Sequence, residues 1–218
     1  MSTQTSPRDG LMVLLAAGAV FAAIVAVAQI PLGTQKALLV EGGLIETLSA
    51  VGYAICIGLM LAFWGLRATL TRWYVVAMLA LFAARELDMD KRPFTEGLLK
   101  SRQYIGDTVP AGERIVSAIL LLAIIATVIT LLWRETGKFI ATLMRRHPAA
   151  VATLAGLLLI VGTKMIDGLG RKLAPYGIEL SEGLNQSLAV IEEVGEFGIP
   201  LMFAIAIYLS ATRKVETV

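Results

Sequence analysis

Acidic residues gather where uncharged stretches of this sequence begin or end. Glu192, Glu193 and Glu196 place three acids within five residues, and the run Arg85-Glu86-Leu87-Asp88 follows an apolar segment. On a helix, Glu192 and Glu196 lie one turn apart, and Glu193 shares a face with Glu196. Grouped carboxylates attract hard cations such as Ca²⁺, Mg²⁺ or Mn²⁺, or hold and pass protons. The pattern therefore predicts an ion or proton site.

The predicted site draws its residues from the ends of several helices. The expected ion or proton ligands are Glu86, Asp88, Asp167, Glu192, Glu193 and Glu196. The expected internal counter-ions are Arg85 and Lys164, and Glu41, Glu46 and Asp90 extend the set. If the ligand is a metal ion (Ca, Mg or Mn), its expected ligands are Glu86, Glu193 and Glu196. The alternative interpretation is that these charges form ion pairs that only fix the helix ends.

The composition places these residues in a membrane protein. Hydrophobic residues make up 57% of the 218 residues, charged residues only 17%, and the mean hydropathy is +0.76. Soluble domains carry about 25% charged residues, so this balance indicates lipid. The formal net charge of +2, without a basic patch interleaved with aromatic residues, argues against nucleic acid as a partner.

The apolar runs predict an all-α, polytopic transmembrane helix bundle that forms a single domain over residues 1–218. A helix needs about 20 largely apolar residues to cross the bilayer. The expected spans number about six, at approximately 11–31, 44–66, 72–90, 113–134, 149–169 and 186–211. The amphipathic linkers 91–112 and 171–183 are expected to lie at the membrane interface at one end. The third, fifth and sixth spans have short uncharged runs, so each takes charged residues some way into the membrane.

The first apolar run needs separate treatment, because Ala26-Val27-Ala28 resembles a signal-peptidase site. The uncharged stretch 11–28 is longer than the apolar region of a usual signal peptide. We therefore expect this segment to be retained as the first helix.

Six spans would put both termini on one side of the membrane and all the acidic residues named above at the opposite end. Lysine and arginine are divided almost equally between the two sides. The basic cluster in 134–146 favours termini in the cytoplasm. The sequence thus predicts a multi-pass protein of the inner (plasma) membrane, with its acidic end in the periplasm.

Several kinds of cofactor chemistry are excluded by composition. His147 is the only histidine, so bis-histidine haem, a Ser-His-Asp triad and a Glu-x-x-His di-iron site cannot form within the chain. Cys56 is the only cysteine and lies in an apolar run, so we expect no disulfide, no Fe–S cluster and a buried, inert thiol. No Walker or Gly-x-Gly-x-x-Gly motif is present, which argues against a nucleotide.

Three functions fit these observations. The first is a small integral membrane protein that binds or conducts a cation or protons through its carboxylate cluster. The second is a non-catalytic subunit or scaffold, within a homo-oligomer or a larger membrane complex. The third is a membrane enzyme acting on a lipid or lipid-linked substrate, with two carboxylates as acid and base. We rank it last, because no nucleophile has a recognisable setting, and we expect binding or transport rather than catalysis.

Small residues predict close contact between the helices that carry the acids. Gly52 and Gly58 lie in the expected second span, and Gly195 and Gly198 lie in the sixth. Pro200 follows in the sixth span and frees the backbone carbonyl four residues before it. That carbonyl is expected to act as a ligand or to mark a kink.

Overall fold

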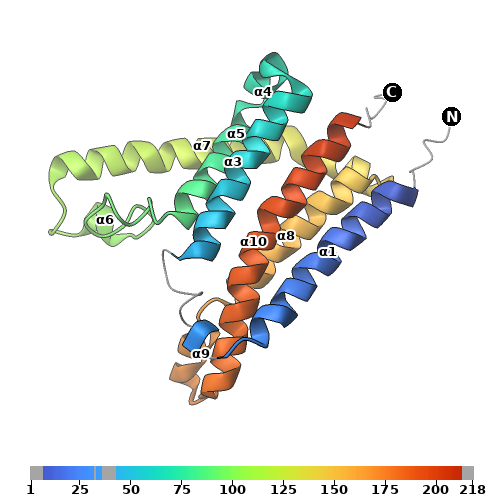
Figure 1. Ribbon diagram of the computed structural model, residues 1–218. Helices are drawn as coiled ribbons and strands as arrows, with labels where there is room; N and C mark the ends of the chain where they lie inside the picture. The colour runs from blue at the N-terminus through green and yellow to red at the C-terminus, as the bar shows by residue number, and fades with distance from the viewer. Residues whose placement is uncertain (1–6, 32, 36–42, 213–218) are drawn as a thin grey trace.

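The computed structural model describes residues 7–31, 33–35 and 43–212 (Figure 1). Within these residues the chain forms helices and turns and contains no strand, which confirms the predicted all-α fold. In the described part of the chain, five helices are long and apolar enough to cross a membrane. They are α1 (Pro7–Ala28), α3 (Leu44–Trp64), α7 (Ala111–Met144), α8 (Pro148–Ile166) and α10 (Glu182–Thr212).

Helix α10 lies at the centre of the bundle and packs against α8, α3 and α1 (Figure 1). Its close approach to α1 and α8 depends on Gly198, where a Cβ atom would lie 2.9 Å from Val20 and 3.1 Å from Leu159. In lipid the surroundings are as apolar as the side chains themselves, so close packing rather than the hydrophobic effect stabilises helix pairs. The core side chains Met202 and Leu209 are accordingly only 1% exposed.

The segment predicted as the third span is divided and shorter than expected. It forms α4 (Leu66–Thr71) and α5 (Trp73–Glu86), and α5 runs beside α3 (Figure 1). The 14 residues of α5 correspond to about 21 Å of helix, against about 30 Å for the hydrocarbon core. This helix is therefore not among the five that qualify as spans by length and composition.

Helix α5 ends at Glu86 because the chain turns into a left-handed conformation two residues later. Asp88 has φ of +54°. The backbone N–H of Met89 donates to the carbonyl of Ala84 at 2.9 Å. The backbone N–H of Asp88 donates to the carbonyl of Arg85 at 3.0 Å. This pair of hydrogen bonds is a Schellman cap, in which glycine usually occupies the left-handed position. The helix thus stops four residues before the predicted end at residue 90, and Asp88 and Asp90 lie on a loop.

Helix α7 runs obliquely across the bundle and projects beyond it (Figure 1). It continues to Met144, ten residues past the predicted end of the fourth span at residue 134. The preceding linker contains the short helix α6 (Arg102–Ile105) and is fixed to α7 by Gln103, which is fully buried. The Gln103 amide donates to the Glu113 carboxylate at 2.8 Å and to the Ser117 hydroxyl at 2.9 Å.

The second predicted linker, 171–183, is also partly helical. It overlaps α9 (Leu169–Leu173) and the 3₁₀ helix η1 (Ala174–Tyr176), and α10 begins within it at Glu182. Helix α9 lies at the end of the bundle where α10 begins (Figure 1). That end also holds the last residues of α8, so the chain brings Asp167, which follows α8, close to the acids of α10.

Candidate functional site: an acidic cleft

A cleft of about 410 Å³ lies where α3, α5, α8 and α10 meet, at the end of the bundle where α5 and α8 end. It is lined by Glu46, Arg85, Glu86, Asp88, Asp90, Lys91, Lys164, Asp167, Glu192, Glu193 and Glu196. The structure thus brings together all six predicted ligands, both predicted counter-ions, and two of the three further acids. The third, Glu41, lies outside the described residues.

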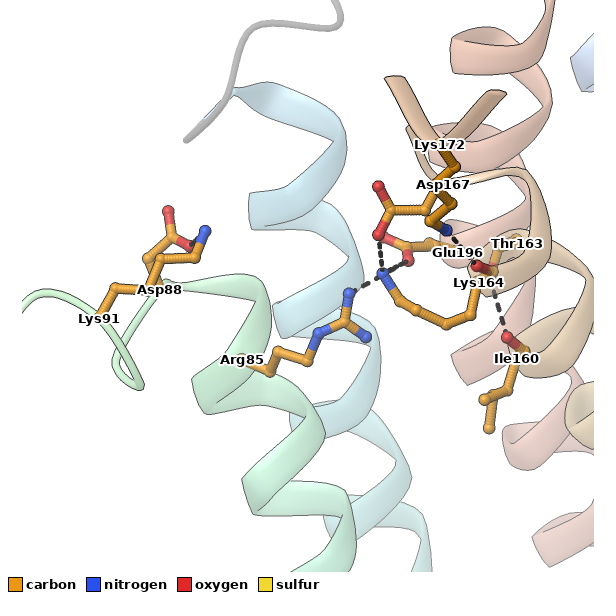
Figure 2. A network of polar contacts seen from close by, with 9 residues as sticks. All are labelled: Arg85, Asp88, Lys91, Ile160, Thr163, Lys164, Asp167, Lys172 and Glu196. Atoms are coloured by element: carbon orange, nitrogen blue, oxygen red, sulfur yellow. Dashed lines mark hydrogen bonds and ion pairs between the residues drawn. The ribbon is translucent and has the colours of Figure 1, made fainter. Parts of the chain in front are cut away.

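Glu196 joins three helices through ion pairs (Figure 2). Its Oε1 atom lies 3.3 Å from Arg85 Nη2 on α5 and 3.2 Å from Lys164 Nζ on α8. Lys164 also forms an ion pair at 3.0 Å with the carboxylate of Asp167, the residue that immediately follows α8. The Glu196 side chain is 10% exposed, whereas Arg85 and Lys164 are 41% and 37% exposed. The two cations therefore reach from the water-accessible rim to a buried carboxylate.

Acidic groups outnumber cationic groups in the cleft, with eight carboxyl groups and three cations among its lining residues. Glu86 is buried, and the carboxyl groups of Asp167 and Glu192 contact each other. Two carboxylates in contact repel one another unless a proton or a cation lies between them. The Oδ1 atom of Asp90 is buried and has no hydrogen-bond partner. The cleft is therefore suited to taking up positive charge.

Sequence reasoning missed one member of the cleft. Lys91 lies three residues after Asp88, and its Nζ atom is 2.7 Å from Asp88 Oδ1 (Figure 2). The i,i+3 spacing was the available signal, although this pair lies in a turn rather than on a helix. Asp88 is thus held at the rim by Lys91, apart from the Glu196 network.

The predicted metal ligands Glu86, Glu193 and Glu196 do not form a preassembled site. Within the described ranges, no group of three or more His, Cys, Asp or Glu side chains is arranged to hold a metal ion. Binding of a divalent ion by these three residues would require their side chains to move together, and the metal hypothesis stays a prediction.

The charge of Lys164 gives the stability of the protein a pH dependence through Asp167. Burial raises the pKa of Asp167, but the hydrogen bond and charge of Lys164, together with the charge of Lys172 and a hydrogen bond with Glu192, outweigh it and hold this pKa below its ordinary value of about 3.9. Because the folded pKa is lowered, this stabilisation is complete above the unfolded pKa and is lost as the pH falls through the folded pKa. We expect Asp167→Asn to flatten the loss of thermal stability below about pH 4.

Melting temperatures measured at acidic pH would test this expectation. Asp107→Asn, at an exposed loop position away from the cleft, is the matched control. Parallel melting curves for the wild type and Asp167→Asn would show that the Lys164 contact contributes nothing to acid stability.

Comparison with family models, with curated proteins and with solved structures found no match to the chain. The fold defines the class, which is a helical protein whose described residues include five helices long and apolar enough to cross a membrane. The functional inference therefore rests on the cleft.

Proposed function

We propose that this protein binds a cation or protons at the acidic cleft and exchanges them with water on one side of the membrane. The observation that carries the proposal is the excess of eight carboxyl groups over three cationic groups around one cleft. Carboxylates at the ends of membrane helices are costly unless paired, protonated or bound to a cation. A site with this excess gains stability from each positive charge that enters it.

The ion pairs of Glu196 suggest how the exchange would proceed. Arg85 and Lys164 act as tethered cations that share the buried carboxylate with whatever ion or proton enters. Both side chains are more than a third exposed, so each can turn toward water when a competing charge reaches Glu196. Lys164 keeps Asp167 as a second partner, which lowers the cost of releasing Glu196.

We further propose that α5, with α4, makes a sixth and shorter crossing. The protein would then lie in the inner membrane with its termini in the cytoplasm, and the cleft would open to the periplasm. Two observations support this crossing. Helix α5 runs beside α3, and it ends with Arg85 and Glu86 at the cleft. A helix shorter than the hydrocarbon core would leave these two charges near the water of the headgroup region.

The proposal predicts an ion- or pH-dependent gain in stability of the detergent-purified protein. Melting temperature would be measured with Ca²⁺, Mg²⁺, Mn²⁺ or EDTA between about pH 5 and pH 8. A ligand at 100 times its dissociation constant that binds only the folded state adds about 2.7 kcal/mol. We expect Glu86→Gln and Glu193→Gln to reduce the response to the bound ion, because each removes a carboxylate from the cleft. Proton movement would be measured in proteoliposomes with a pH-sensitive dye.

The matched control is Glu179→Gln, an exposed acid outside the cleft lining. This variant should leave unchanged both the ion-dependent gain in melting temperature and the proton movement. A melting temperature indifferent to every cation, together with no proton movement, would exclude the proposed function.

One observation favours the scaffold function as a second candidate. Of the 34 residues of α7, only Ser117 and Thr127 are buried, and the helix packs lightly against α5 and α8. An apolar helix with so little contact inside the chain has a face available for another membrane protein. This candidate predicts co-purification of a stoichiometric partner and no dependence of stability on ions.

A further inference from the structure

A second cavity, of about 800 Å³, lies at the opposite end of α5 from the acidic cleft. Helix α5 begins at Trp73 beside this cavity and ends at Glu86 in the cleft. The cavity walls come from the end of α3, from α4 and the start of α5, and from the C-terminal half of α7. The two sites are therefore separate and open at different levels of the protein.

Cationic side chains dominate this cavity. Arg67, Arg72, Arg134 and Lys138 line it. The nearby carboxylate of Glu135 accepts a hydrogen bond from the Tyr74 hydroxyl at 2.5 Å and pairs with Lys138 at 3.1 Å. Among the described residues, the three arginines form no ion pair with a carboxylate. They are available for an anion that enters from outside.

Two of the arginines are held in place by aromatic rings. The Arg72 guanidinium lies 4.7 Å from the centre of the Trp64 ring, and that of Arg134 lies 5.6 Å from the centre of the Tyr74 ring. Stacking on a ring orients the guanidinium plane and leaves its N–H edge free. An arginine fixed in this way is suited to bidentate binding of a phosphate group.

Tryptophan positions indicate the depth of the cavity in the membrane. All three tryptophans of the chain lie at this end: Trp64 and Trp133 in the cavity wall, and Trp73 packed against Tyr74. Tryptophan prefers the headgroup level of the bilayer. Trp133 is 87% exposed and closes the uncharged part of α7, directly before Arg134. The cavity thus combines tryptophans that favour headgroup depth, an apolar wall, and arginines that form no ion pair among the described residues.

We propose that this cavity binds the phosphate of an anionic phospholipid headgroup, held mainly by Arg72 and Arg134. Free phosphate offers the same charged group. A lipid fits better, because its glycerol and acyl chains would contact the exposed Trp133 and the apolar face of α7 that precedes Trp133 in the sequence. The site is independent of the acidic cleft and of the function proposed for it.

Intrinsic tryptophan fluorescence reports on this end of the protein, because every tryptophan lies there. Detergent micelles containing the purified protein would be titrated with brominated phosphatidylglycerol or brominated phosphatidylcholine, whose bromines quench nearby tryptophans. We expect half-quenching by the anionic lipid at about a fivefold lower mole fraction than by the zwitterionic lipid. Inorganic phosphate at equal ionic strength should not displace the quencher.

The double variant Arg72→Gln/Arg134→Gln should lose the preference for the anionic lipid while phosphatidylcholine still quenches it. The matched control Arg145→Gln/Arg146→Gln removes two arginines that follow α7 outside the cavity, and it should keep the preference. Equal quenching of the wild type by the two lipids, or displacement of the lipid by inorganic phosphate, would overturn the proposal. Both outcomes are measured on the wild-type protein, so they do not depend on whether the variants fold.

Discussion

Replacement of Lys164 by glutamine should lower the free energy of unfolding by about 2 kcal/mol near neutral pH. Lys164 bonds two carboxylates, Glu196 at 3.2 Å and Asp167 at 3.0 Å, in a cleft where acids already outnumber cations. Removing one partner of a fully buried ion pair costs about 3–5 kcal/mol. The lower value expected here reflects the exposure of Lys164, which lets water solvate the carboxylates it leaves.

Acidification below about pH 4 should reduce the effect of Lys164→Gln, because Asp167 then takes up a proton and no longer needs a cation beside it. The measurement is thermal or denaturant unfolding of the purified protein at neutral pH and at a pH below about 4. Lys100→Gln is the matched control, since Lys100 is exposed and does not line the cleft. A cost for Lys164→Gln no larger than for Lys100→Gln, or one that grows with acidity, would show that the ion pairs do not stabilise the fold.

The membership of the cleft was largely predictable from the sequence. Charges that interrupt or bound apolar runs were interpreted as helix ends, and the order of the runs along the chain brings those ends to one side. Glu86 and Asp167 do lie at helix ends, whereas Glu193 lies inside α10, which begins at Glu182. Glu86, Asp167 and Glu193 lie on three different elements and were grouped by this reasoning alone. The structure places all three in the cleft lining.

The pairing within the cleft was not predictable, because it depends on how each helix is rotated. Helical residues three positions apart point about 60° apart, so Glu193 and Glu196 could have exchanged roles after a rotation of α10 by about that angle. In the structure, Glu196 receives both Arg85 and Lys164. Nothing in a single sequence fixes that rotation, since it follows from packing against α3, α8 and α1.

The end of α5 was mispredicted for a local reason. The sequence offers no glycine or proline at residues 87–90, so the helix was expected to continue to residue 90. Asp88 takes the left-handed position that glycine usually fills in this cap. Aspartate tolerates this conformation better than most residues, but it is not by itself a signal that a helix stops.

Gly52→Ala should destabilise the protein by about 2 kcal/mol, through contact between α3 and α10. A Cβ atom at residue 52 would lie 2.9 Å from both Cβ and Cγ of Pro200, a ring that is fully buried and cannot rotate away. The Cys56 thiol, one helical turn further along α3, donates to the Pro200 carbonyl at 3.2 Å. Cys56 is buried and free, as predicted. Separating the helices would break this contact as well.

Gly58→Ala is the matched control for this change, and it corrects one prediction. Six residues further along α3 place Gly58 about 120° around the helix from Gly52. A Cβ atom there meets nothing within 4 Å, so the expected packing role of Gly58 is wrong. Alanine favours a helix over glycine by up to about 1 kcal/mol, so this variant should be neutral or slightly stabilised in a thermal unfolding assay. Equal stability of the two variants would contradict the tight α3–α10 contact.

The contact at Gly52 also tests whether helix packing sets the geometry of the cleft. Pro200 lies one turn after Glu196 on α10, so displacing α3 from the proline should also move Glu46, in the first turn of α3, relative to the acidic residues of α10. We expect Gly52→Ala to weaken any ion-dependent gain in melting temperature, although it changes no charged group. If the gain persists in a folded Gly52→Ala protein, binding depends on the charges alone and tolerates small helix shifts.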